Sequence, residues 1–291
     1  MILATTIPTA NFQTAADMFD SWRNDVLTGT APTFYPIGKG ELERIEIGPG
    51  LVTLFGGAPA AGKTAFVMQA VTDALRLTPT LRALVCNVEM PPRVLMDRQL
   101  SRLSGIDLST IRHRCFTDEH KERLDIGLCD LKALADRLAF VKSPFDLENI
   151  AAAADAFRPD LILLDYVQRI TPPGKHVDSR TAINATIDYI RQFADAGLAV
   201  LVVAAVGRTK DNKGRNSYSG DGLNLASFRE SSELEFGADD AFILVPTDDK
   251  KGKADKPASN VILRHLKARH SEAKDLIMTF DRRCQRFEPG C

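Results

Sequence analysis

One stretch of eight residues, 57–64 with the sequence GAPAAGKT, constrains the fold of this chain more than any other feature. It matches the pattern G-x-x-x-x-G-K-[ST], in which successive backbone N–H groups surround phosphate groups. An apolar run at 51–55 precedes it, and a stretch of helical periodicity at 64–77 follows it. A helix that starts directly after such a loop adds partial positive charge at its N-terminus. The sequence therefore predicts a strand, a phosphate-binding loop and a helix in succession.

Within this loop, we expect Lys63 to reach the β- and γ-phosphates of ATP and the Thr64 hydroxyl to bind Mg²⁺. Glycines at 57 and 62 permit turns that a Cβ atom would obstruct. The competing interpretation is a glycine-rich turn that happens to precede a lysine. The expected nucleotide contacts in this segment are Gly57, Ala58, Ala60, Ala61, Gly62, Lys63, Thr64 and Ala65.

From about residue 45, short apolar runs alternate with stretches of helical periodicity. Most runs are continuously apolar, which is typical of strands buried on both faces of a parallel sheet. This alternation predicts a doubly wound α/β fold with a mainly parallel sheet, followed by an antiparallel hairpin. The expected strands are 51–55, 82–87, 138–142, 161–165, 200–205 and 241–245, the expected helices are 64–77, 92–104, 118–137, 146–157 and 179–197, and the hairpin joins 260–266 to 275–280 across a polar turn at 267–274.

The N-terminal region has a different pattern. Residues 11–28 predict an amphipathic helix, followed by a Gly- and Pro-containing linker at 29–40. A helix this short needs a surface on which to dock, either its own domain or a neighbouring subunit. We therefore expect an N-terminal helix and extension at 1–35 and one ATPase domain at 36–291. The apolar seam of the helix comprises Phe12, Ala15, Phe19, Trp22 and Val26.

Composition excludes several classes of protein. The net charge of −1 gives no overall basic field for nucleic acid, so such binding would need local basic patches. The five cysteines form no C-x-x-C pair and no Cys/His cluster, which argues against zinc and against a disulfide framework. No window approaches the ~18 apolar residues of a membrane span, and we expect a soluble, cytoplasmic protein without a membrane partner.

Two acidic residues follow predicted strands. Asp165 directly follows the apolar run at 161–164, where P-loop proteins have an acidic residue that binds the metal together with the loop hydroxyl. The alternative is an aspartate that only caps a loop. Glu89 comes just after the strand at 82–87. Ligands of open parallel sheets bind beyond the carboxyl ends of the strands, so Glu89 is placed to orient an attacking water. The alternative for Glu89 is a carboxylate that interacts with the dipole of the next helix.

These residues belong to a series of segments that resemble the motor domain of DnaB-type replicative helicases over about residues 30–288. In chain order, NVEMP at 87–91 resembles the family's S-L-E-M-P, LLDYVQ at 163–168 resembles I-D-Y-L-Q, FRES at 228–231 resembles L-R-E-S, KAR at 267–269 resembles K-Q-R, and MTF at 278–280 and RFE at 286–288 are similar to the closing strands. Each segment alone is a weak signal, whereas their shared order and spacing are specific.

The resemblance implies a RecA-like P-loop ATPase that hydrolyses ATP with Mg²⁺ at subunit interfaces of a hexameric ring and moves on single-stranded DNA as a helicase. By this resemblance Glu89 is the catalytic base, and Lys267 and Arg269 reach the ATP site of the next subunit. The 12–26 seam becomes a linker helix that packs on the adjacent subunit. A primase or a loader is the implied protein partner.

For DNA, the resemblance points to the L-R-E-S-like loop, with Arg229 and Glu230. A polar, flexible segment at 207–222 adds basic residues that a ring would repeat around its channel; the alternative is a solvated surface loop. The basic residues of this segment are Arg208, Lys210, Lys213 and Arg215.

The chain also departs from the family. Ala205 stands where the family has a glutamine that senses the γ-phosphate, and Ser232 replaces the glycine after L-R-E-S. The side chain of alanine cannot hydrogen-bond a phosphate, which bears on how hydrolysis is coupled to DNA movement. Two further functions stay open. One is a RecA-like ATPase that switches single-strand binding or regulates a helicase without processive unwinding. The other is a P-loop kinase for a small molecule, against which the segments at 228–231 and 267–269 argue.

Overall fold

The computed structural model describes residues 12–174, 178–207, 209–210, 216–217, 223–228, 237–247 and 258–290. The chain divides into two compact units, one up to Thr33 and one from Phe34 onward. The second unit contains the sheet and the 57–64 loop.

The first unit contains helix α1 (Ala15–Thr28). Thr14 and Asp17 form a capping box at its N-terminus, and Gly29 ends it in a left-handed conformation. This cap explains why the helix starts at Ala15 rather than at residue 11. None of its residues is buried, and Trp22 and Val26 of the apolar seam are 53% and 60% exposed.

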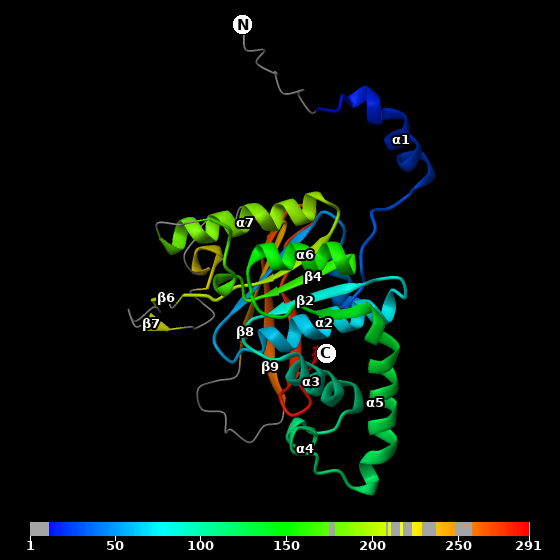
Figure 1. Ribbon diagram of the computed structural model, residues 1–291, viewed down its shortest axis with the longest axis vertical. Coiled ribbons are helices and arrows are strands. Elements are labelled where there is room, and N and C mark those ends of the chain that lie inside the picture. The colour runs from blue at the N-terminus through cyan, green and yellow to red at the C-terminus, as the bar shows by residue number, and fades with distance from the viewer. Residues whose placement is uncertain are drawn as a thin grey trace, which may run out of the picture. The chain divides into compact units, whose positions relative to one another are not determined.

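A nine-stranded sheet organises the second unit, in the order β11-β10-β9-β8-β1-β5-β4-β2-β3 (Figure 1). The six strands from β8 to β3 in this order run parallel to one another. Strands β9, β10 and β11 continue the sheet beyond β8, and each pairs antiparallel with its neighbours. This arrangement confirms the predicted α/β fold with a mainly parallel sheet and a C-terminal antiparallel hairpin. The parallel strands are β1 (Val52–Gly57), β2 (Ala83–Asn87), β3 (Leu138–Phe140), β4 (Leu161–Asp165), β5 (Ala199–Val203) and β8 (Asp240–Pro246), and the antiparallel strands are β9 (Ala258–Ala268), β10 (Leu276–Asp281) and β11 (Arg286–Pro289).

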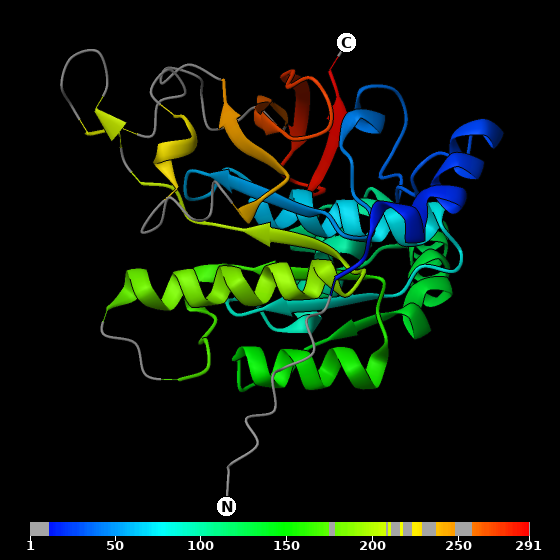
Figure 2. The same cartoon turned by 90° about the horizontal axis from the view of Figure 1, so that it is seen from above.

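Helices cover both faces of this sheet (Figure 1). Successive side chains of a strand point to opposite faces, so Phe55 packs in the core with α2, whereas Leu54 packs in the core with α6 and α7. Figure 2 shows the C-terminal strands, coloured orange to red, at the edge of the sheet remote from α6. The helices are α2 (Lys63–Leu77), α3 (Pro92–Ser104), α4 (Leu108–His113), α5 (Lys121–Leu134), α6 (Leu147–Phe157) and α7 (Ser179–Asp195).

Several boundaries differ from the predictions. The expected helix at 118–137 is α5 flanked by two 3₁₀ turns, and strand β5 stops at Val203, so Ala204 and Ala205 lie beyond it. Helix α4 was not predicted because six residues are too few to show a helical period. Strand β9 continues to Ala268, so Lys267 is paired in the sheet with Ala241 instead of standing in the polar turn. Hydrogen bonding to β8 overrides the polar composition there.

Shorter elements complete the described chain. Five 3₁₀ helices and a separate antiparallel pair of two-residue strands, β6 and β7, connect the larger elements. Among the described residues, no helix is long and apolar enough to cross a membrane. The 3₁₀ helices are Gly40–Arg44, Asp118–His120, Ala135–Arg137, Val167–Arg169 and Leu225–Ser227, and the strands are β6 (Thr209–Lys210) and β7 (Asn216–Ser217).

Candidate nucleotide-binding site

The carboxyl ends of the central parallel strands meet at one edge of the sheet, where a cavity of about 470 Å³ opens. Strand pairing sets Asn87 beside Asp165, and Asp165 beside Val203. Residues far apart in the sequence are thereby brought to one wall. The cavity is lined by Pro59, Ala60, Gly62, Lys63, Thr64, Ala65, Glu89, Arg98, Asp165, Tyr166, Ala205, Phe280, Arg282 and Gln285.

The 57–64 loop follows β1 and leads into α2, as the sequence predicts. Gly62 adopts φ +97°, and a Cβ atom there would lie 2.9 Å from the ring of Phe287, so the loop requires glycine at this position. Five of the eight loop and helix residues expected to contact nucleotide line the cavity: Ala60, Gly62, Lys63, Thr64 and Ala65.

The other three expected contacts have different surroundings. Gly57 and Ala58 present their carbonyl oxygens to the Lys63 ammonium, at 2.9 and 3.1 Å, and Ala61 is buried. Burial lowers the pKa of Lys63, while Asp165 and Glu89 oppose that change. Lys63 is thus a partly desolvated cation at the cavity wall, held by two carbonyl groups that a phosphate oxygen can replace.

Asp165 receives two hydrogen bonds on the same oxygen. The Thr64 hydroxyl and the Asn87 side-chain amide both donate to its Oδ2, each at 2.7 Å. Within the described residues, no hydrogen bond reaches Oδ1. The buried carboxylate is therefore oriented with one oxygen committed to protein donors.

Burial raises the pKa of the Asp165 carboxyl to about 6. The Thr64 hydrogen bond, Lys63 and Arg98 lower it, and the negative charge of Glu89 raises it further. The positive charges of the protein therefore do not fully balance the negative charge of this carboxylate, and a bound cation would stabilise its ionised form.

The residues present fit a magnesium ion. Thr64 and Asp165 supply hard oxygen ligands, which Mg²⁺ prefers. Among the described residues, no cluster of three or more His, Cys, Asp or Glu side chains could enclose a metal by itself. Mg²⁺ is usually held by one or two protein oxygens together with substrate phosphates, so this sparse set matches a metal that arrives with a nucleotide.

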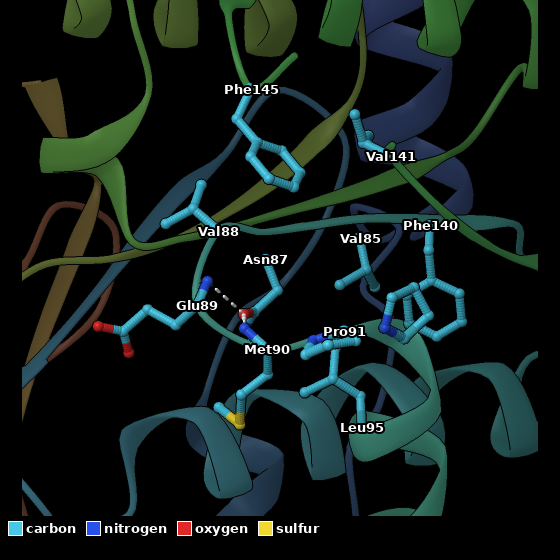
Figure 3. Close-up of a pocket in the computed structure, with 11 residues that line it drawn as sticks. Val85, Asn87, Val88, Glu89, Met90, Pro91, Leu95, Phe140, Val141 and Phe145 are labelled. Atoms are coloured by element: carbon cyan, nitrogen blue, oxygen red, sulfur yellow. Dashed lines mark hydrogen bonds between the residues drawn. The ribbon is translucent and has the colours of Figure 1, made fainter. Parts of the chain in front are cut away.

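Glu89 follows β2 on a turn at the mouth of the cavity, and it is exposed. Its backbone N–H donates to Oδ1 of Asn87 at 3.0 Å, and that of Met90 donates to the same atom at 2.7 Å. Figure 3 shows that the Glu89 carboxylate points away from the apolar side chains behind this turn. The base candidate is therefore free to face the phosphate end of the cavity.

Arg98 on α3 is a cavity residue that the sequence reasoning missed. Its Nε atom is buried and has no hydrogen-bond partner among the described residues, and burial lowers its pKa. The sequence offered one signal, because Arg98 lies three residues after the apolar Leu95 and so shares its face of the predicted helix. An arginine on the buried face of a helix requires an anionic partner.

The cavity has a second group of lining residues that was also not predicted. Phe280 on β10, together with Arg282 and Gln285 from the β10–β11 turn, lines it. Arg282 stacks over Phe280 with 5.1 Å to the ring centroid, and it donates to the carbonyl of Ala60 at 3.1 Å. A flat cation, an aromatic ring and an amide can contact a nucleobase, whereas Thr64 and Asp165 suit phosphate and metal.

Lys267 and Arg269 lie away from this cavity. The Lys267 ammonium donates to the carbonyl of Ala238 at 2.7 Å, and Arg269 forms an ion pair with the buried Asp239. Their partners precede Asp240, which pairs with Thr53 near the start of β1, whereas the phosphate loop begins at Gly57, at the end of β1. At about 3.3 Å per strand residue, the two cations lie roughly 15 Å along the strands from the phosphate loop of their own subunit. They cannot serve the phosphate site of the same subunit.

Most of the candidate DNA-binding residues, namely Arg208, Lys213, Arg215, Arg229 and Glu230, lie outside the described residues. Lys210 belongs to β6, although its side chain is not among those described.

The described flanks of these segments meet beside the nucleotide cavity. Val206 pairs with Phe228, and Gly207 donates its N–H to the carbonyl of Ser227 at 2.6 Å. Ala205, one residue before Val206, lines the cavity, and Gln168 hydrogen-bonds its backbone N–H and C=O at 3.1 and 3.3 Å.

A phosphate-loop sequence between strand β1 and the following helix, with an acidic residue at the end of β4, which β5 separates from β1, is the pattern of the P-loop class of α/β proteins. Within this class, the model of the DnaB-like helicase C terminal domain matches residues 44–289. The chain belongs to that family.

Individual relatives agree with this assignment. Replicative DNA helicase DnaB of Buchnera aphidicola subsp. Schizaphis graminum (strain Sg) is 25% identical over 276 residues, which cover 92% of this chain and 57% of that helicase. The chain thus spans little more than half the length of this relative.

Two solved structures have the same fold. The ATPase domain of G40P superimposes with a TM-score of 0.80 at 17% identity, covering 95% of this chain and 99% of the other. A DnaB-like replicative helicase, whose structure was described with its primase interactions, gives 0.78 at 17% identity, covering 96% of this chain and 67% of the other. At this identity the likeness concerns the fold.

Proposed function

We propose that this chain is the ATP-hydrolysing motor of a DnaB-type helicase, a ring that moves on single-stranded DNA. The contact that carries the proposal is the 2.7 Å hydrogen bond between Thr64 of the phosphate loop and the buried Asp165 of β4. It joins the predicted loop to the predicted metal-site carboxylate across 101 residues of sequence, at the edge of the sheet where ligands of such folds bind. Membership of the DnaB-like family supports the same function.

In this proposal the phosphates lie against the 57–64 loop and the N-terminus of α2. Lys63 exchanges the carbonyl groups of Gly57 and Ala58 for phosphate oxygens, and Arg98 supplies a second cation from α3. Thr64 and Asp165 hold magnesium, which offsets the negative charge of the phosphates. The base end of the nucleotide faces Arg282 and Phe280.

Hydrolysis needs a water in line with the bond between the γ-phosphorus and the β,γ-bridging oxygen. Glu89 accepts a proton from that water while the water oxygen bonds to the γ-phosphorus. The bond from the γ-phosphorus to the bridging oxygen breaks, which yields ADP and inorganic phosphate. The exposed carboxylate at the mouth of the cavity is the described acidic side chain best placed for this step, since Asp165 is committed to Thr64 and Asn87.

A ring would give two cations near the end of β9 a role in catalysis. Lys267 and Arg269 lie remote from their own phosphate loop, so we infer that they reach the site of a neighbouring subunit, as arginine fingers do. The exposed apolar seam of α1 suits docking on an adjacent subunit. A hexamer is the ring size that the DnaB resemblance favours, and primase is a candidate partner because the solved DnaB-like relative interacts with it.

DNA contact is assigned to the two segments that leave the paired residues Val206 and Phe228. Phe228 packs against Gly56, next to the phosphate loop, since a Cβ atom on Gly56 would lie 2.5 Å from its ring. A structural change at the bound nucleotide can reach Val206 and Phe228, where these segments begin, by two routes. One is the contact between Gly56 and Phe228, and the other is the pair of hydrogen bonds between Gln168 and Ala205.

The test is ATP hydrolysis with and without single-stranded DNA, together with a mass measurement in ATP and Mg²⁺ and a strand-displacement assay. We expect DNA-stimulated turnover, a ring-sized assembly and displacement, all lost in Lys63→Ala. Turnover that DNA does not stimulate would argue against a motor. DNA stimulation without displacement would favour the ATP-switched binding protein instead.

A further inference from the structure

The side chain of Asn87, the last residue of β2, connects the Asp165 carboxylate to the backbone of the turn that carries Glu89. Its amide nitrogen donates to Oδ2 of Asp165 at 2.7 Å. Its amide oxygen accepts the backbone N–H groups of Glu89 and Met90, at 3.0 and 2.7 Å (Figure 3). One buried side chain thus bonds the metal-site carboxylate with one end and the turn that carries the candidate base with the other.

Packing also holds part of this turn, because Val88 and Met90 contact the two main apolar clusters. A cavity of about 200 Å³ lies on its far side, lined mainly by apolar side chains that include Val85, Leu95 and Phe140 (Figure 3). Open space on that side supplies no packing contacts, so a turn bordering it can shift once its hydrogen bonds are removed. The Val88 N–H donates to the carbonyl of Asp165 at 2.9 Å, which anchors the start of the turn but not Glu89 itself.

Asparagine suits this bridge because its planar amide carries a donor and an acceptor that point in different directions. The family segment that residues 87–91 resemble begins with serine. A serine hydroxyl is shorter by one heavy atom and has a single oxygen, so it cannot span both partners in the same way.

We propose that Asn87 is a positioning residue that fixes the Glu89 turn relative to Asp165, so that the base and the metal site keep a constant separation. The inference rests on the proposed ATP hydrolysis for its kinetic consequence. Its structural part, the restraint of the turn, is independent of that activity. A displacement of about 1 Å at a reacting group can cost on the order of a hundredfold in rate.

The test compares Asn87→Ala, Asn87→Asp and Asn87→Ser in the full chain. Alanine removes both halves of the bridge. Aspartate keeps the acceptor for the turn but loses the donor to Asp165, and serine keeps one short acceptor. Asn149→Ala is the matched control, because that amide also donates twice, to the carbonyls of Lys142 and Pro144 at 2.8 and 2.6 Å, yet it does not line the nucleotide cavity.

We expect Asn87→Ala to lower kcat by roughly ten- to a hundredfold, while the Kd for a fluorescent ADP changes less than about threefold. Asn87→Asp should lose kcat to a similar extent, and Asn87→Ser should fall in between. Hydrogen exchange of a peptide covering residues 86–92, measured without nucleotide, should speed up in Asn87→Ala and stay unchanged in Asn149→Ala. This readout reports the turn directly.

Three results would overturn the inference: kcat within twofold of wild type in Asn87→Ala, full activity in Asn87→Asp, or equal losses of kcat and melting temperature in the Asn87→Ala and Asn149→Ala variants. A wild-type chain without ATP turnover would contradict the proposed function instead. In that case, faster exchange at residues 86–92 in Asn87→Ala alone would still support the restraint of the turn, and unchanged exchange would refute it.

Discussion

Replacing Asp165 with asparagine should stabilise the protein in the absence of magnesium and nucleotide while it abolishes turnover. Burial raises the pKa of this carboxyl from 3.8 to about 6, so its ionised form is disfavoured in the folded state. The replacement side chain would be neutral, and its amide oxygen can still accept from Thr64 and Asn87. The negative charge of Asp165 would favour metal binding, but it lowers the free energy of unfolding when no cation is bound.

The magnitude follows from proton linkage. A tenfold change in a proton-binding constant corresponds to ~1.4 kcal/mol, so a pKa raised from 3.8 to about 6 makes the ionised residue cost ~3 kcal/mol at pH 7.5. The folded state binds more protons than the unfolded state between these two values. The cost is therefore small near pH 4, roughly half developed near pH 5, and constant above about pH 7.

The assay is thermal and urea unfolding in EDTA at pH 5, 6 and 7.5, with wild type and Asp165→Asn side by side. We expect the variant to melt several degrees higher at pH 7.5, and the difference to shrink by about half at pH 5. Asp146→Asn is the control, since Asp146 caps α6 and asparagine caps a helix equally well. An Asp165→Asn protein that is less stable at pH 7.5, or a difference independent of pH, would refute the reasoning.

Three further predictions concern the site. Glu89→Gln should reduce ATP turnover at least a hundredfold and keep nucleotide binding within about threefold, because an amide cannot accept the proton; near-normal turnover would remove Glu89 as the base. Arg98→Ala should weaken ATP binding by about tenfold with a smaller effect on ADP, measured by fluorescent-nucleotide titration, whereas equal effects on both would place Arg98 away from the γ-phosphate. Co-assembled Arg269→Ala and Glu89→Gln subunits should recover part of the activity that each lacks alone; verified mixed oligomers without recovery would exclude action across subunits.

Local sequence patterns predicted the individual elements well. The strand at 161–165 and the helix at 92–104 have the expected bounds, because a buried parallel strand is a continuous apolar run and a helix is bounded by residues such as Pro91 and Gly105. The 57–64 loop was predictable from the sequence for the same reason, since its glycines and lysine lie within eight consecutive residues. These features depend on neighbours in the chain.

Other features depended on strand pairing and were not predictable from a local pattern. Lys267 belongs to β9 because it pairs with Ala241, although its segment is polar. Arg98, Phe280 and Arg282 face the cavity only because α3 and the C-terminal strands pack around the carboxyl edge of the sheet. None of these residues stands near the phosphate loop in sequence.

The sequence by itself determined the fold class, and it pointed to the phosphate loop and two acidic residues as candidates for the site, since each is encoded by spacing within a short segment. Only the tertiary structure decided that Thr64, Asn87 and Asp165 share hydrogen bonds, and that a cavity lies behind the Glu89 turn. The physical reason is that parallel pairing of β2, β4 and β5 aligns strand ends from distant parts of the chain, and hydrogen-bond distances between those ends follow from the register of the whole sheet.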